Sequence, residues 1–208
     1  MRIFFGATLP DETKRQIAEI QAMLRPEIWN ARFEGRDKLH ITLLFIGDLR
    51  PQKVDALFNS AAVELGKHSG RSPSTEIIGM NYFPNWQVRR GIWLDCRDDG
   101  SLASFADSVK TASMDYGVVP EKREFKPHIT IARLPESAGR RTGKAGLREE
   151  SGERRSHEAP DLHKFTAEGK LPMERFFPNG VALFESTLKP SGSEYRILYE
   201  YSLEHTGD

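Results

Sequence analysis

Two segments of the sequence carry the same residue types in the same order. They align without a gap, as Lys-Leu-His-Ile-Thr-Leu-Leu-Phe-Ile over 38–46 and Lys-Pro-His-Ile-Thr-Ile-Ala-Arg-Leu over 126–134. Each copy places a histidine and a threonine two positions apart, and residues two apart in a strand point to the same face. The pattern therefore predicts an imidazole beside a hydroxyl in each copy, from His40 with Thr42 and from His128 with Thr130.

Two such pairs facing one cleft suit an in-line displacement at phosphorus. One imidazole accepts a proton from the attacking group while the other donates a proton to the leaving oxygen, and an ordinary histidine pKa near 6.5 allows both forms near pH 7. Threonine hydroxyls can donate hydrogen bonds to the oxygens on which charge builds. We therefore expect His40 and His128 to be catalytic, and Thr42 and Thr130 to bind the phosphate.

Other kinds of site fit the sequence less well. A metal site needs three or four convergent ligands, and the two copies supply two histidines with no carboxylate at matching positions. No glycine-rich phosphate loop is present either. We expect neither a metal nor another cofactor. The remaining histidines have no paired motif and are interpreted as bystanders: His68, His157, His163 and His205.

The hydrophobic pattern predicts the elements that position the two copies. Strands are expected over 2–8, 39–46, 75–83, 91–96, 127–134, 180–187 and 194–203. Helices are expected from Pro10, from Pro51, over 101–116 and, as a short one, near 160–168. In the first helix Ile17, Ile20, Met23 and Leu24 fall at helical spacing and should face the core. Adjacent strands with helices between them favour an α+β fold with largely antiparallel pairing.

Composition limits the classes of partner. Lysine and arginine number 30, and aspartate and glutamate also number 30. A protein that tracks long nucleic acid is usually basic, so we expect any polyanion to be bound locally. The single cysteine, Cys96, excludes an internal disulfide, suits the cytoplasm, and lies in an expected strand, where it should behave as a small apolar residue. No segment is long and apolar enough to span a membrane.

Several basic residues lie near the second copy of the motif or on loops. Lys126 follows Lys122 and Arg123, and this cluster favours a polyanion near the cleft. Arg89 and Arg90 precede an expected strand, where they either contact the backbone of a bound nucleic acid or are simply solvated. Lys38 and Lys126 stand two residues before each histidine, so they would share its face if the strands extend that far.

The stretch 136–158 differs from the rest of the chain. It contains six lysines and arginines, five glutamates and no aromatic residue. Such a composition is typical of an exposed polar insertion. A basic arm that contacts RNA is the alternative.

With these motifs the sequence resembles the two-histidine phosphoesterase superfamily, whose signature is a pair of His-x-Thr motifs. Within it, the sequence is most similar to the RNA 2′,3′-cyclic phosphodiesterases, also called 2′–5′ RNA ligase-like proteins. The likeness includes the opening strand 2–5 followed by Leu9-Pro10, and the segment 184–188 with Tyr195. It covers nearly the whole chain except 136–158.

The resemblance implies a single bilobal domain over 1–208, with mostly antiparallel sheet, helices outside and a central groove. It implies metal-independent hydrolysis of an RNA 2′,3′-cyclic phosphate to a 2′-phosphate by a monomer. His40 would be the general acid and His128 the base, although pseudo-symmetry allows the roles to exchange. Phe45 would stack on a base, and Arg133 would contact phosphate or ribose.

Three other functions are compatible with the same residues. The substrate could be a small cyclic nucleotide or ADP-ribose 1″,2″-cyclic phosphate. The reverse reaction would join RNA ends, such as tRNA halves, through a 2′–5′ bond. A module that binds RNA ends without turnover is the third, and it has no need of two imidazoles.

Overall fold

The fold comes from a computed structural model, which describes residues 1–68, 70–85, 90–118, 124–135, 161–162, 165, 171, 175–190 and 192–205. In chain order the helices and strands are β1 (Arg2–Thr8), α1 (Asp11–Leu24), β2 (Arg32–Phe33), β3 (His40–Asp48), α2 (Val54–Leu65), β4 (Glu76–Phe83), β5 (Gly91–Arg97), α3 (Ser101–Ser113), β6 (His128–Arg133), β7 (Gly180–Lys189) and β8 (Gly192–Ser202). The expected α+β class is confirmed. The helix expected near 160–168 and the insertion 136–158 lie wholly or mostly outside the described residues.

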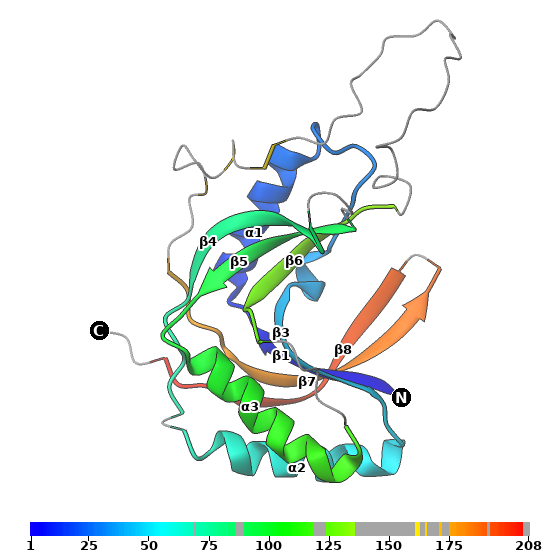
Figure 1. The fold of residues 1–208 in the computed structure, drawn as a ribbon, viewed down its shortest axis with the longest axis vertical. Helices are drawn as coiled ribbons and strands as arrows, with labels where there is room; N and C mark the ends of the chain where they lie inside the picture. Colours follow the sequence, from blue (N-terminus) through cyan, green and yellow to red (C-terminus); the bar gives the residue numbers. More distant parts are fainter. Residues whose placement is uncertain are drawn as a thin grey trace, which may run out of the picture.

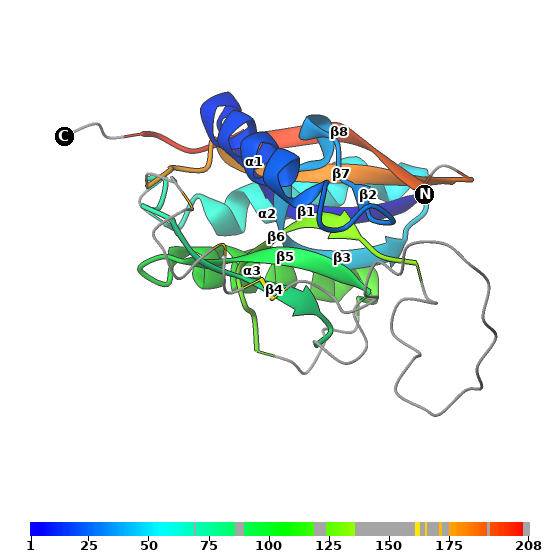
Figure 2. The ribbon, with the colours of Figure 1, turned by 90° about the horizontal axis from the view of Figure 1, so that it is seen from above.

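Within the described residues, one eight-stranded sheet runs in the order β4-β5-β6-β3-β1-β7-β8, with β2 paired to β6. All of these pairs are antiparallel. The central strands β3 and β6 share a single register pair, Ile41 opposite Ile129. The sheet therefore divides at this seam into two halves, which diverge in Figure 1. Figure 2 shows β7 and β8 on one side of the molecule and β4 and β5 on the other.

Each half of the sheet contains the same succession of elements. The order β1-α1-β3 in one half corresponds to β5-α3-β6 in the other, and both successions end on a strand that begins with a motif histidine. Helix α3 contacts β3, whereas α1 contacts β6. Each motif strand thus packs against the helix that belongs to the other half in chain order. This exchange ties the two halves together at the seam.

The helices bury the apolar faces that the sequence indicated, with one exception. Ile17, Ile20 and Leu24 of α1 are fully buried, but Met23 is 40% exposed. Leu24 lies seven residues after Ile17, close to two full helical turns, while Met23 falls to the side of that face. Gln21 is also buried, and its amide donates hydrogen bonds to the carbonyls of Glu34 and Ile131, at 2.8 and 2.9 Å.

Cys96 is buried in the main apolar cluster, as its place in a strand predicted. Burial raises the pKa of its thiol.

Candidate active site

The two motifs lie side by side at the seam of the sheet. Strand β3 begins at His40 and β6 begins at His128. Antiparallel pairing of Ile41 with Ile129 places His40 opposite Thr130, and Thr42 opposite His128. The two isoleucines are fully buried on the other face. Direct strand pairing, rather than two lobes closing over a gap, therefore brings the four predicted side chains together.

Both motif strands contain a β-bulge at the same position, one residue after the threonine. Leu43 has no partner in the register of β1, and Ile131 has none in the register of β5. A bulge reverses the alternation of side chains beyond it. Phe45 consequently lies opposite Phe4, and Arg133 opposite Gly91. The bulges thus place Phe45 and Arg133 on the same face as the His-Thr pairs.

Aromatic rings surround His40 on this face. The centroid of its ring lies 4.9 Å from that of Phe4, 5.3 Å from Phe184 and 5.4 Å from Tyr195. Phe4 and Phe184 are themselves stacked at 4.8 Å. The face of this half of the sheet is therefore apolar around one catalytic candidate. All three rings lie in or at segments that the family likeness includes, namely 2–5, 184–188 and Tyr195, but their contact with His40 was not predicted.

The hydrogen bonds of His40 fix its reactive nitrogen. Nδ1 lies 2.6 Å from the carbonyl oxygen of Lys38, and Nε2 lies 2.9 Å from the hydroxyl of Thr42. Because a carbonyl only accepts, Nδ1 carries the proton in the neutral ring, and the Thr42 hydroxyl donates to Nε2. Removal from water is the main cause that lowers the pKa of His40 to about 4; the hydrogen bond to the Lys38 carbonyl opposes it, and the positive charges of His128 and Arg133 contribute in the same direction as burial.

His128 has the same backbone contact but different neighbours. Its Nδ1 lies 2.8 Å from the carbonyl oxygen of Lys126, which again leaves Nε2 toward the site. The ring of Trp93 lies 4.4 Å away, and the indole N–H of Trp93 is buried without a hydrogen-bond partner among the described residues. Asp95 lies opposite His128 in the register of β5. One ring, instead of three, shields this histidine.

The lysines before the two histidines do not extend the strands, because β3 and β6 begin at the histidines. The condition under which Lys38 and Lys126 would share the strand face is therefore not met. Their backbone carbonyls orient the imidazoles instead.

Arg133 is held by a residue that the sequence did not indicate. Its Nε donates to Oε1 of Glu34 at 2.9 Å. Glu34 is 9% exposed, and the Arg133 side chain is 48% exposed. The backbone N–H of Glu34 also donates to the carbonyl of Ile131, at 2.9 Å. Because Glu34 takes the Nε edge, the outer nitrogens of the guanidinium can contact an anion. Glu34 and Arg133 are far apart in the sequence, so no local pattern links them.

Comparison with known proteins places the chain in a family. Residues 8–93 match the family model described as LigT like Phosphoesterase. A Thermotoga maritima protein named RNA 2′,3′-cyclic phosphodiesterase is 24% identical over 98% of this chain and 96% of its own length. An Escherichia coli protein of the same name is 30% identical over 64% of this chain and 71% of its own length. The chain belongs to the LigT-like phosphoesterase family.

A solved structure shares the fold of this LigT-like chain. The crystal structure of a Thermus thermophilus protein superimposes with a TM-score of 0.68 and 24% identity, and the match covers 100% of both chains. The predicted α+β, mostly antiparallel architecture is thus shared with this solved structure. Since the match covers the whole chain, it includes both strands of the seam.

The other predicted contact residues lie around the seam. Phe45 is 62% exposed. Arg90, just before β5, is exposed, and its backbone N–H donates to the carbonyl of Phe83 at the end of β4. Lys126 is also exposed. Arg89, Lys122 and Arg123 lie outside the described residues.

The remaining histidines lie apart from the motifs. His68 is hydrogen-bonded to Ser108 at 2.7 Å, and His205 packs on the ring of Phe177 at 4.2 Å. His157 and His163 are outside the described residues.

In the described ranges, no group of three or more His, Cys, Asp or Glu side chains is arranged to hold a metal ion. Among the same residues, no helix has the length and apolar character needed to cross a membrane.

Proposed function

We propose that this protein hydrolyses the 2′,3′-cyclic phosphate at the end of an RNA, without a metal ion, and leaves a 2′-phosphate. The pairing of the two motifs carries the proposal. Each histidine has its Nδ1 bound to a backbone carbonyl, so Nε2 is the nitrogen left for proton transfer. Nε2 of His40 accepts from the Thr42 hydroxyl, and a threonine of the other motif lies opposite each histidine. The relatives named RNA 2′,3′-cyclic phosphodiesterase support the choice of substrate.

The phosphate would bind at the seam. On binding, the hydroxyl proton of Thr42 turns from Nε2 of His40 to a non-bridging oxygen, which frees Nε2 to accept a proton, and the Thr130 hydroxyl donates to another oxygen. The outer nitrogens of Arg133 form charge-assisted hydrogen bonds with the same oxygens. Glu34 keeps the guanidinium in place through Nε. The ring of Phe45 offers a face on which the base of the terminal nucleotide stacks.

The surroundings of the two rings favour one assignment of roles. His40, whose pKa is lowered to about 4, is neutral at pH 7 and can accept a proton at Nε2. It takes this proton from water, whose oxygen forms the new bond to phosphorus as the bond from phosphorus to the 3′ oxygen breaks. His128 donates the proton from its Nε2 to that 3′ oxygen. These roles are the reverse of those that the family resemblance implied.

The test uses a short RNA with a 2′,3′-cyclic phosphate end. We expect the parent protein to release a 2′-phosphate, and His40→Ala and His128→Ala each to lose most of the turnover. His205→Ala is the matched control, because His205 is an exposed histidine outside the site. A 3′-phosphate product, or full turnover by both motif variants, would overturn the proposal.

The same seam accommodates smaller substrates and the reverse reaction. Lysine and arginine are equal in number to aspartate and glutamate, which favours a 2′,3′-cyclic mononucleotide or an ADP-ribose cyclic phosphate as much as a long RNA. Ligation would use the same nitrogens in the opposite direction, with a 5′-hydroxyl in place of water. Addition of a 5′-hydroxyl RNA separates hydrolysis from joining, because only joining lengthens the product. A cytoplasmic, monomeric protein stays our expectation.

A further inference from the structure

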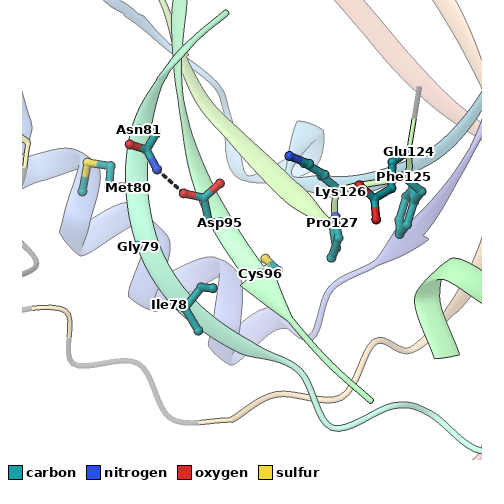
Figure 3. Close-up of a pocket in the computed structure, with 10 residues that line it drawn as sticks. All are labelled: Ile78, Gly79, Met80, Asn81, Asp95, Cys96, Glu124, Phe125, Lys126 and Pro127. Atoms are coloured by element: carbon teal, nitrogen blue, oxygen red, sulfur yellow. Dashed lines mark hydrogen bonds between the residues drawn. The ribbon is translucent and has the colours of Figure 1, made fainter. Parts of the chain in front are cut away.

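A cavity of about 420 Å³ adjoins the His128 half of the site (Figure 3). Strand β4 contributes Gly79 and Asn81, β5 contributes Asp95, and the segment before β6 contributes Phe125 and Lys126. This volume lies in the range of small-molecule binding pockets.

Two links join the cavity to the catalytic face. Lys126, on its wall, supplies the carbonyl that orients the ring of His128. Asp95, on the opposite wall, lies directly across from His128 in the register of β5. A ligand in the cavity would therefore sit next to a phosphate bound at the seam, on the side away from Phe45 and β3.

The polar groups of the cavity are mainly hydrogen-bond acceptors. The carboxylate of Asp95 is held by a hydrogen bond from the amide of Asn81 (Figure 3). Glu124 adds a second carboxylate to the lining. Two carboxylates disfavour a phosphate inside the cavity, but they readily accept from neutral N–H groups.

The other walls are apolar or cationic. Phe125 and Pro127 line the side opposite Asn81 and Asp95. A nucleobase combines apolar faces with N–H groups on its edge, and proteins that read single-stranded RNA bind bases in this way. Lys126 provides the cation for the phosphodiester that joins such a base to the reacting nucleotide.

We propose that this cavity binds the base of the nucleotide preceding the cyclic-phosphate end, and that it prefers bases with an exocyclic amino group. The inference rests on the proposed function, because it takes the seam as the site of the terminal phosphate. Guanine, adenine and cytosine present an exocyclic amino donor to the carboxylates, whereas uracil has only its ring N3–H, which lies between two carbonyl oxygens that the carboxylates repel. The cavity thereby distinguishes an RNA end from a cyclic mononucleotide.

Gly79 offers a way to fill the cavity without removing a polar group. A Cβ at this position would lie 3.6 Å from Oδ2 of Asp95, an ordinary van der Waals contact. Gly79 is not among the glycines with positive φ, so its backbone accepts a side chain. Gly79→Ala is therefore the mild control, and Gly79→Leu occupies the space intended for the base.

The first experiment compares kcat/KM for adenosine 2′,3′-cyclic phosphate with kcat/KM for four dinucleotides NpA, where N is G, A, C or U. Each dinucleotide ends in the same 2′,3′-cyclic phosphate. For the parent we expect kcat/KM of the dinucleotides with G, A or C as the first base to exceed that of the mononucleotide at least tenfold. The increase in kcat/KM should be smaller for the dinucleotide with U. Gly79→Leu should abolish the gain and leave mononucleotide turnover within twofold of the parent. Asp95→Asn should reduce the preference for G over U. An equal kcat/KM for dinucleotides and mononucleotide in the parent, or a full gain in Gly79→Leu, would overturn the inference.

A binding measurement decides the inference independently of turnover. Calorimetry measures the affinity for the dinucleoside monophosphate GpA. The parent and Gly79→Ala should bind GpA with similar affinity, and Gly79→Leu should bind it at least tenfold more weakly. Thermal denaturation checks that all variants are folded. If the parent hydrolyses none of the substrates, the proposed function fails, while GpA binding that is lost in Gly79→Leu still supports the cavity. Unchanged GpA binding in Gly79→Leu contradicts it.

Discussion

The aromatic enclosure of His40 predicts a loss of stability in mild acid. Its folded-state pKa of about 4 lies below the ordinary histidine value of 6.5 because the ring is removed from water. Between these two pH values the unfolded chain binds a proton at this position that the folded chain does not. The neutral His40 ring therefore makes its full contribution to the free energy of unfolding above about pH 6.5. This contribution decreases as the pH falls toward 4.

The size of the effect follows from the difference between the two pKa values. A gap of about 2.5 pH units corresponds to roughly 3 kcal/mol of free energy of unfolding. Between pH 7 and pH 4.5 most of this is lost, roughly 2 kcal/mol. For a chain of this length, 1 kcal/mol shifts Tm by about 2–4 °C, so the contribution of His40 to the fall in Tm is roughly 4–8 °C.

Urea denaturation followed by circular dichroism at the two pH values measures this contribution. Other groups also titrate in this range, so the quantity of interest is the difference between parent and His40→Gln, whose amide cannot be protonated. We expect the parent to lose roughly 2 kcal/mol more than His40→Gln on acidification. His205→Gln, which changes an exposed histidine, should follow the parent. Equal losses in the parent and His40→Gln would refute the reasoning that burial of the ring sets its pKa.

Three further predictions concern the catalytic face. Glu34→Gln weakens the contact that holds the Arg133 guanidinium at Nε, so kcat/KM for a cyclic phosphate should fall about tenfold. In an Arg133→Ala background the same change should lower kcat/KM little further. An equal fall in both backgrounds would show that the role of Glu34 is purely structural. Phe45→Ala removes a stacking face worth about 1–3 kcal/mol, so KM for adenosine 2′,3′-cyclic phosphate should rise at least fivefold. Phe45→Tyr is the control, because tyrosine retains the aromatic face. An unchanged KM in Phe45→Ala would exclude stacking of the base on Phe45. Because two imidazoles perform both proton transfers, turnover should be the same before and after EDTA treatment. Loss of activity that a divalent ion restores would contradict the metal-independent mechanism.

Much of the fold could be predicted from the sequence because its elements follow local patterns. The strand of residues 2–8, the helix from Asp11 and the helix beginning at Ser101 are set by apolar spacing, and the structure has each within a few residues of its expected bounds. The short pairing of Arg32 and Phe33 with β6 was not predicted. Two residues carry no periodicity, and their strand exists only because β6 offers an edge.

The site was predictable in composition but not in its electrostatics. The motif repeat identified both histidines, yet the three rings around His40 come from β1, β7 and β8. The environment that lowers the His40 pKa therefore depends on tertiary packing, and the near-identical motifs gave no reason to expect the two histidines to differ. The same limit applies to Glu34, which meets Arg133 only in the folded chain.

The positions of Phe45 and Arg133 show what a repeat reveals that periodicity does not. Strict alternation from His40 and Thr42 assigns Phe45 to the opposite, buried face, and the same rule misplaces Arg133. The bulges at Leu43 and Ile131 each add one residue to the strand, which reverses the alternation and moves Phe45 and Arg133 to the face of the histidines. Because the two motifs align without a gap, each copy keeps its extra residue at the same place. The alignment thus predicts that Phe45 and Arg133 are equivalent, one on each side of the seam, although only the hydrogen-bonding register shows that both lie on the face of the histidines.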